Sequence, residues 1–335
     1  MFLEKLKQII EKDRKDRPEY LRSILKMSLI EYILEYIYTS VTYRNLLFKG
    51  GTCLRICYEL PRLSEDIDLD FIESVNINNL KDDLIQYFKR ELAYDDIYAS
   101  VTNNNQTITL KFPILRMLGV SNASESEILY VKLDIQKTSF SNTKPDLIPR
   151  QSYIIKAYPL PLLFTGKVNA IFTRDKKIGR ENRSIPKGRD YFDLLWFLEK
   201  GIRPDLQELD KDLHIQADLE FKINLDRKVL TTFNAYKNDI INDLKPFIAD
   251  NAALESFIES FIPLYEKLSL SIFDYRKPNE NIKYNTITDS LISLINEKSL
   301  NGSNFENILQ EIDTYRKGGT PINVVNSYEF ITSRS

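Results

Sequence analysis

The chain has 335 residues, of which 43% are hydrophobic, and its 46 basic and 48 acidic side chains nearly cancel. A chain of this length can fill a large core, so we expect one or two globular domains. The near balance of charge excludes a general electrostatic affinity for nucleic acid, and such a partner would need a local basic patch. No N-terminal leader pattern occurs and no apolar run approaches the roughly 18 residues that span a membrane, so we expect a cytoplasmic protein without a membrane partner.

Few of the side chains that commonly carry catalysis or bind zinc are present. His214 is the single histidine and stands in a polar stretch without a nucleophile motif, which argues against Ser-His-Asp and Cys-His chemistry and favours a surface position. Cys53 and Cys57 lie four residues apart on a predicted helix, a spacing that suits half of a zinc site or two small core residues. Because two cysteines and one histidine cannot complete a four-ligand site of nitrogen and sulfur, we favour the core interpretation.

Hydrophobic spacing predicts mixed helices and strands after a charged segment at residues 1–17. Strands are expected where apolar residues alternate or form short runs, and helices where they recur every three or four residues. In chain order the predicted elements are a helix at 20–41, a strand at 44–50, a helix at 52–60, an acidic strand at 66–72, a charged helix at 77–92, a hairpin at 97–112, a strand at 127–138, and helices at 164–174 and 189–201. From about residue 204 onward the pattern is helical. We therefore predict an α+β domain at 1–200 and a mainly α-helical domain at 201–335.

The acidic strand follows shortly after a glycine pair, in the segment FKGGTCLRICYELPRLSEDIDLDF. Side chains alternate along a strand, so Asp66, Asp68 and Asp70 are expected on one face of the sheet. Asp134 stands in a predicted strand whose setting is otherwise aliphatic and β-branched, so a functional role would explain this carboxylate. Asp66, Asp68 and Asp134 fit the carboxylates of a two-metal phosphoryl-transfer centre that binds Mg²⁺ or Mn²⁺, with Asp70 left outside the metal site.

The glycine pair suits the phosphates of a nucleotide. Gly50 and Gly51 would let the backbone approach a triphosphate, and Thr52 could add a hydroxyl donor at the start of the helix. Taken singly, a glycine pair is most often a turn, and an acidic strand end is commonly solvated or binds calcium. The order and spacing of these features favour phosphoryl transfer.

Five motifs together resemble the nucleotidyltransferases of the DNA polymerase β superfamily, and most closely the AbiEii-type toxin family. The motifs are FKGGTCLR, RLSEDIDLDF, VKLDIQ, GKVNAIFTR and KGRDYFDLLWFL, and they span about residues 45–200. The resemblance implies a polymerase β-like core with a mixed sheet and a nucleoside triphosphate (NTP) as substrate. It also implies a growth-inhibiting toxin that is encoded beside a cognate antitoxin.

The resemblance also implies roles for individual residues. Asp66 and Asp68 would bind the catalytic metals, Lys167 would contact the nucleotide phosphates, and Asp190 or Asp193 would supply a further acidic group. Lys167 could instead be a surface lysine whose stem covers apolar neighbours, and one of the two aspartates could merely cap its helix. The remaining pair, Arg62 and Ser64, could touch phosphate or serve the structure.

A basic segment at residues 174–189 holds seven Lys or Arg and two acids, a local charge of 7 − 2 = +5. It could be a solvated loop or a surface that follows an RNA backbone. We predict transfer of a nucleoside monophosphate to the 3′ end of tRNA. A protein hydroxyl, a small-molecule hydroxyl and a non-catalytic binding role for the fold are the alternatives, and the presence of every metal carboxylate favours the enzyme.

Overall fold

The computed structural model describes residues 2–12, 17–122, 124–138, 144–173, 176–178, 183–213 and 218–272. Within these residues the chain combines a mixed seven-stranded sheet, a two-stranded sheet and helices, which confirms the predicted α+β class. The strands are β1 Leu47–Lys49, β2 Asp66–Phe71, β3 Tyr98–Thr102, β4 Thr107–Pro113, β5 Ile128–Lys137, β6 Asp146–Pro149, β7 Ile154–Ala157, β8 Lys176–Ile178 and β9 Arg183–Ile185. The helices are α1 Phe2–Lys12, α2 Pro18–Thr39, α3 Gly50–Tyr58, α4 Ile77–Arg90, α5 Leu160–Thr173, α6 Gly188–Glu199, α7 Leu206–Leu213, α8 Asp218–Ala235, α9 Lys237–Leu244 and α10 Asn251–Ile272, with a 3₁₀ turn at Lys245–Phe247.

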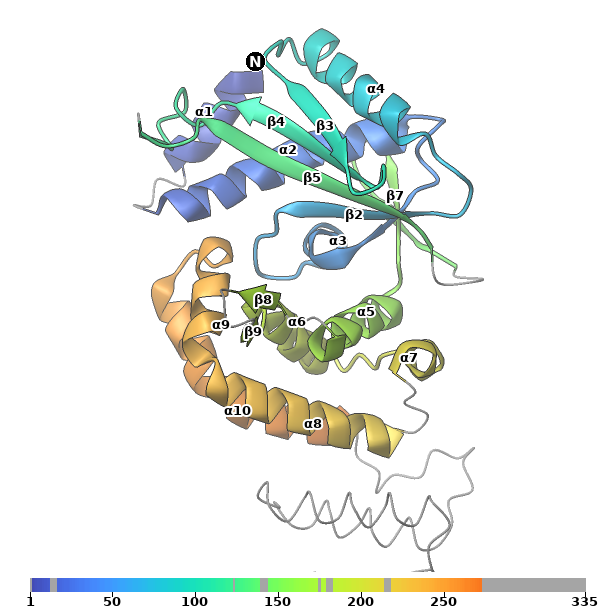
Figure 1. The fold of residues 1–335 in the computed structure, drawn as a ribbon, viewed down its shortest axis with the longest axis vertical. Helices are drawn as coiled ribbons and strands as arrows, with labels where there is room; N and C mark the ends of the chain where they lie inside the picture. Colours follow the sequence, from blue (N-terminus) through green and yellow to red (C-terminus); the bar gives the residue numbers. More distant parts are fainter. Residues whose placement is uncertain are drawn as a thin grey trace, which may run out of the picture.

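The strands of the large sheet lie in the order β3-β4-β5-β2-β1-β7-β6 (Figure 1). The pairs β2–β5 and β1–β7 are parallel, and the other neighbouring strands are antiparallel. This order brings β5, β2 and β1 together at the centre of the sheet. The predicted acidic strands and the strand before the glycine pair are therefore direct neighbours.

The sheet has one apolar and one polar face because its strands alternate. In β5 the buried side chains of Leu129, Val131 and Leu133 alternate with exposed or half-buried polar ones. Helices α2 and α4 cover the apolar face, where Phe88 of α4 packs edge-on against Phe112 of β4 with ring centroids 5.0 Å apart. The polar face is the one that carries the acidic side chains.

A predicted hairpin and an unpredicted N-terminal helix show how far local sequence patterns determine the structure. The predicted hairpin is confirmed as β3–β4, and its turn holds Asn103, Asn104 and Asn105 with φ of 55°, 51° and 62°, a region that asparagine tolerates well. Residues 1–17 were expected to be a charged segment without a predicted element. The structure forms α1 there, since Phe2, Leu6 and Ile10 make a buried stripe that packs on the core.

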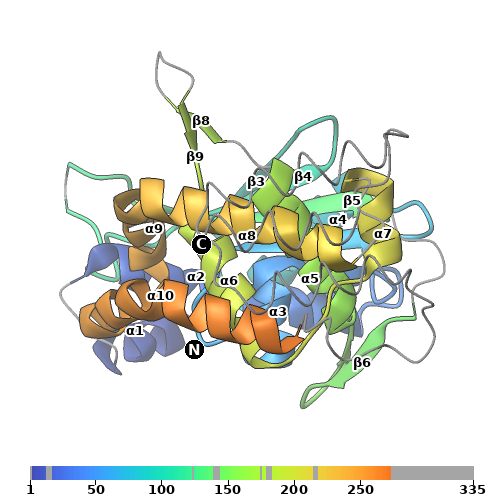
Figure 2. The same ribbon diagram turned by 90° about the horizontal axis from the view of Figure 1, so that it is seen from below.

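Helices α5 to α10 form a layer that lies below α3 in the view of Figure 1. Helix α6 packs against α5, α9 and α10, and Figure 2 shows α8 and α10 running side by side beneath it. Tyr191 of α6 meets Phe233 of α8 and Phe261 of α10, in both cases with ring centroids 6.1 Å apart. One continuous core thus joins described residues on both sides of position 200, and the predicted division at 200/201 stays a prediction. No helix in the described ranges has the length and apolar character needed to cross a membrane.

Candidate active site

Strand register brings the three predicted metal carboxylates onto one face of the sheet. In the parallel pair β2–β5, Asp68 lies opposite Asp134 and Asp66 lies opposite Lys132. Ile67 and Leu69 alternate with these aspartates and are fully buried on the other face. A hydrogen bond of 2.6 Å from the Thr107 hydroxyl orients the Asp134 carboxylate.

The carboxylates on β2 are crowded and partly shielded from water. Burial, followed by the Asp66 carboxylate, raises the pKa of Asp68 to about 6, although Lys49 and Lys167 act in the opposite direction. Burial and the neighbouring Glu65 raise the pKa of Asp66. A cation placed between these side chains would relieve their mutual repulsion.

The donor chemistry fits a divalent hard cation. Carboxylate oxygens are the ligands that Mg²⁺ and Mn²⁺ prefer, and Mg²⁺ is usually bound through one or two carboxylates together with substrate phosphates and water. Among the residues that the structure describes, no group of three or more His, Cys, Asp or Glu side chains is arranged to hold a metal ion, and this includes Asp66, Asp68 and Asp134. Cys53 and Cys57 are free cysteines. His214 lies outside the described residues. A metal-binding role of Asp66, Asp68 and Asp134, shared with the phosphates of a bound nucleotide, stays a prediction.

The glycine pair allows the backbone to approach these carboxylates closely. Gly50 has φ of 79°, and a Cβ atom on it would lie 1.9 Å from Oδ2 of Asp68. A Cβ on Gly51 would lie 2.9 Å from the Arg62 guanidinium. Glycine is therefore required at the first position for both conformation and space.

A pocket of about 440 Å³ opens over these residues, between the sheet and helices α5 and α6. Of the predicted site residues, it contacts all except Thr52 and Asp193. Its lining consists of Lys49, Gly50, Gly51, Arg62, Ser64, Asp66, Asp68, Asp134, Gln136, Tyr158, Leu162, Leu163, Gly166, Lys167, Asn169, Ala170, Lys187, Arg189 and Asp190.

Lys167 is held at the pocket by two aspartates of α6. Its Nζ lies 3.1 Å from Asp190 Oδ1 and 2.7 Å from Asp193 Oδ2, and only 14% of its side chain is exposed. This burial argues against the surface-lysine interpretation. Asp190 lines the pocket beside the lysine, so Lys167 and Asp190 present a fixed pair of opposite charges to it.

Asp193 lies behind that pair and is completely buried. Arg62 grips it with two parallel hydrogen bonds, Nε to Oδ1 at 2.6 Å and Nη2 to Oδ2 at 2.7 Å. Burial raises the pKa of Asp193, but Arg62 and Lys167 outweigh that effect and hold the pKa below its ordinary value. Arg62 is itself 2% exposed, so its guanidinium connects the acidic strand to α6.

Thr52 and Ser64 support the β2 backbone. Thr52 is fully buried; its hydroxyl donates to the Asp66 carbonyl and lies 2.9 Å from the Ser64 hydroxyl. In this position Thr52 fixes the start of the acidic strand. A direct contact between Thr52 and a nucleotide stays a prediction.

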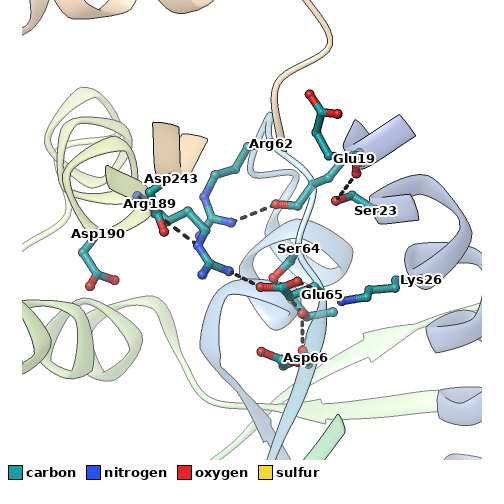
Figure 3. Close-up of polar contacts among 12 residues, drawn as sticks. Glu19, Ser23, Lys26, Arg62, Ser64, Glu65, Asp66, Arg189, Asp190 and Asp243 are labelled. Carbon is teal, nitrogen blue, oxygen red and sulfur yellow. Dashed lines mark hydrogen bonds and ion pairs between the residues drawn. The ribbon is translucent and has the colours of Figure 1, made fainter. Parts of the chain in front are cut away.

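Two groups of residues beside the site were not identified from the sequence. Figure 3 shows the first, in which Glu65 accepts from Lys26 of α2 at 2.9 Å and from Arg189 of α6 at 3.0 Å. Arg189 also contacts Asp243 of α9, with Nε and Oδ2 3.4 Å apart. Glu65 thus connects the start of β2 to α2 and α6, and Arg189 extends this network to α9, which lies beyond position 200. In the sequence, only the acidic character of Glu65 beside Asp66 indicated such a role.

The second group gives Asp70 partners within the protein. Asp70 is 1% exposed and pairs with Lys49, with Nζ and Oδ1 2.6 Å apart. It also accepts from the Tyr158 hydroxyl at 2.9 Å. Lys49 and Tyr158 both line the pocket, and Lys49 lies opposite Asp68 in the β1–β2 register.

Comparison with known proteins gives one family match and several distant structural likenesses. None of the curated proteins is significantly similar to the chain in sequence. Among solved structures, JHP933 from Helicobacter pylori is 15% identical with a TM-score of 0.45, over 75% of this chain and 94% of that one. MenT4, a nucleotidyltransferase toxin from Mycobacterium tuberculosis H37Rv, is 12% identical with a TM-score of 0.45, over 81% of this chain and 94% of that one. These likenesses are too distant to support an argument.

The family match covers most of the chain. The family model described as nucleotidyl transferase AbiEii toxin, type IV toxin-antitoxin system, matches residues 33–263, which include every residue placed at the pocket above. The chain therefore belongs to the AbiEii family of nucleotidyltransferase toxins.

Proposed function

We propose that this nucleotidyltransferase toxin transfers a nucleoside monophosphate from an NTP to the 3′-hydroxyl of tRNA, in a reaction that depends on Mg²⁺ or Mn²⁺. The observation that carries the proposal is the alignment of Asp68 with Asp134 beside Gly50 and Lys167 in one pocket. Phosphoryl transfer needs positioning and neutralisation of charge more than covalent chemistry from the protein. The arrangement supplies both.

Each pocket residue has a role in this proposal. Asp66, Asp68 and Asp134 would hold the divalent cations, which supply charge neutralisation and in-line orientation when bound. Gly50 and Gly51 would accommodate the triphosphate, and Lys167 would balance negative charge that develops on it. Asp190 orients Lys167, and the acceptor hydroxyl attacks the α-phosphate without a protein nucleophile. The new phosphodiester bond forms as the bond to the β-phosphate breaks, so pyrophosphate leaves and the hydroxyl proton passes to water.

The decisive experiment offers labelled NTPs and Mg²⁺ with intact tRNA and with tRNA whose terminal ribose has been oxidised to a dialdehyde. Label on intact tRNA alone supports the proposal. Label on a protein, on a small molecule or equally on oxidised tRNA refutes tRNA 3′-end transfer. Asp66→Asn, Asp68→Asn and a chelator should each abolish the label, and full activity in chelator would contradict the metal dependence.

A second test concerns Lys167. Lys167→Ala should lower the rate by several orders of magnitude, and Lys167→Arg should recover little, since a planar fork replaces a compact charge. The matched control is Lys89→Ala on α4, a half-buried lysine on the far side of the sheet. An alanine variant at position 167 with wild-type turnover would remove this lysine from the site.

The basic segment 174–189 supports an RNA acceptor by its charge. Strands β8 and β9 form a hairpin that projects from the molecule (Figure 2), while the side chains of residues 174–185 lie outside what the structure describes. Substituting Lys176, Lys177 and Arg180 by alanine should flatten the salt dependence of tRNA binding by roughly one unit per lost phosphate contact. An unchanged slope would exclude the segment from the RNA site.

A further inference from the structure

The polar face of β3, β4 and β5 is an exposed surface that extends outward from the carboxylates. The register places Tyr98 opposite Lys111, and Lys111 opposite Tyr130. The next row along the strands places Ser100, Thr109 and Lys132 side by side. We call these six residues, Tyr98, Ser100, Thr109, Lys111, Tyr130 and Lys132, the open face.

The two tyrosines of the open face are exposed, Tyr98 on the edge strand β3 and Tyr130 on the interior strand β5. Tyr98 is 44% exposed and Tyr130 is 41% exposed. The helices that pack on these strands, α4 on β3 and α2 on β5, do so from the apolar face, where Leu110 and Val131 are fully buried. Figure 1 shows α2 and α4 together on that side of the sheet.

The open face is continuous with the active site. The row after Thr109 and Lys132 consists of Thr107 and Asp134, which share the 2.6 Å hydrogen bond at the pocket. Lys132 also lies opposite Asp66. At about 3.3 Å per residue, Tyr130 is about 13 Å from Asp134 along β5. A ligand that ends at the carboxylates can therefore extend over the tyrosines.

The chemistry of the open face suits a single-stranded nucleic acid. Its two aromatic rings are flanked by two lysines, and Lys111 Nζ lies 5.5 Å from the centre of the Tyr98 ring. Its six positions hold two lysines and no acidic residue, and they border Asp66 and Asp134 of the pocket. Exposed aromatics on a sheet stack two or three bases in RNA-recognition domains, and lysines beside them bind phosphate.

We propose that the open face binds the single-stranded 3′ end of the RNA acceptor and directs its terminal hydroxyl to the pocket of Asp68 and Asp134. This proposal rests on the proposed function, whose acceptor it places on the protein. Tyr98 and Tyr130 stack on bases, while Lys111 and Lys132 contact the backbone. The last ribose lies over β2 and β5, and the preceding nucleotides lie over β4 and β3.

The test measures binding of a fluorescent single-stranded oligoribonucleotide to the full chain without NTP, by anisotropy at several salt concentrations. Tyr130→Ala and Tyr98→Ala should each weaken binding about 5- to 160-fold, the range for loss of one stacked base, and Tyr130→Phe should restore it. Neither tyrosine variant should alter the salt slope. Lys111→Ala should reduce the slope by about 0.7, the value for one phosphate contact on a single strand.

Two variants outside the face are matched controls. Leu147→Ala removes an exposed side chain on β6, at the other edge of the same sheet, and Lys89→Ala removes a lysine of α4. Both should bind the oligoribonucleotide as the wild type does. Near-ultraviolet circular dichroism confirms that each variant is folded. Unchanged binding by folded Tyr98→Ala, Tyr130→Ala and Lys111→Ala would overturn the proposal.

Transfer kinetics separate this proposal from the proposed function. With tRNA as acceptor, Tyr130→Ala should raise KM for tRNA and leave KM for the NTP unchanged, and a raised KM for the NTP alone would assign the face to the nucleotide and overturn the proposal. A wild-type protein that labels no RNA refutes the proposed function. The binding experiment still reports on the open face in that case, because it needs neither NTP nor catalysis.

Discussion

At the scale of single residues, the site is shaped by like charges held close together. Asp68 lies beside Asp66 on β2 and opposite Asp134 on β5. Its raised pKa shows that the protein itself disfavours this carboxylate in its charged form. Residues that serve catalysis are often unfavourable for folding. The effect of a substitution on stability can therefore be separated from its effect on activity.

The first prediction uses the pH dependence of stability in metal-free protein. The folded-state pKa of Asp68, about 6, lies above the ordinary value of 3.8, so the folded state binds more protons between these values. The contribution of Asp68 to the free energy of unfolding therefore falls as pH rises through this window. Asp68→Asn should be more stable than the wild type by about 1–3 kcal/mol at pH 7 and equal to it below pH 4, in urea unfolding with chelator. A variant less stable than the wild type at pH 7 would contradict this.

The second prediction distinguishes the two aspartates of α6. Asp193→Asn leaves the buried Arg62 without its charged partner and should cost about 3–5 kcal/mol of stability. Asp190→Asn, whose carboxylate faces the pocket, should lower activity with a much smaller loss of stability. The folded-state pKa of Asp193 is depressed, so its contribution is present above pH 3.8 and is lost as pH falls through the folded-state pKa. Thermal unfolding and transfer rates of both variants check the distinction.

At the scale of elements, α6 is the part that joins the site to the helical layer. Its first residue, Gly188, crosses α9 so closely that a Cβ atom would lie 2.3 Å from the Ile240 carbonyl oxygen. Asp190 and Asp193 follow this crossing two and five residues later on the same helix. The close approach of two backbones thus determines where those carboxylates lie.

The third prediction compares two helical glycines. Gly188→Ala should destabilise the protein by about 1–3 kcal/mol, since neither backbone can move freely. Gly166→Ala on α5, where a Cβ meets nothing within 4 Å, should stabilise it by about 0.5–1 kcal/mol. Melting temperatures should shift in opposite directions. A neutral Gly188→Ala would show that the crossing can widen at no cost.

At the scale of the whole molecule, the sheet and the helical layer share one core. Arg189 stacks on Phe247, with its Cζ 4.4 Å from the ring centre, and the Leu63 amide donates to the Phe247 carbonyl at 2.9 Å. The acidic strand is thus anchored by the segment between α9 and α10. Residues after position 200 are part of the support of the site.

The fourth prediction concerns a chain of residues 1–200. It should aggregate or lack a cooperative unfolding transition, because the apolar side of α6 would lose Phe233 and Phe261. Size-exclusion chromatography and near-ultraviolet circular dichroism test this against the full chain. A monomeric, cooperatively folded fragment would establish the two-domain division at 200/201.

The fifth prediction links the site to the effect expected of a toxin. Expression of the wild-type chain should slow bacterial growth, and Asp66→Asn at equal abundance should not. Co-expression with a cognate antitoxin should restore growth of cells that make the wild type. Equal toxicity of the wild type and Asp66→Asn would separate growth inhibition from the carboxylates.

The sequence by itself determined the features that depend on local periodicity. Alternation placed Asp66, Asp68 and Asp70 on one face of a strand, and helical spacing gave α2, α5 and α6 to within a few residues. These patterns are readable because each depends on residues two to four positions apart. The motifs then indicated the family, which the family match confirms.

The tertiary structure decided which of these side chains meet. Three contacts join residues that lie far apart in the chain or on different elements. They are the contacts of Asp70 with Lys49 and Tyr158, the Arg62–Asp193 ion pair, and the close approach of Gly188 to Ile240. No local pattern encodes such partners, since strand order and helix crossings arise only when the whole core packs. The same packing left the polar face of β3–β5 exposed beside the carboxylates. A strand's alternation predicts that it has a polar face, and only the arrangement of the helices determines whether that face is open to a ligand.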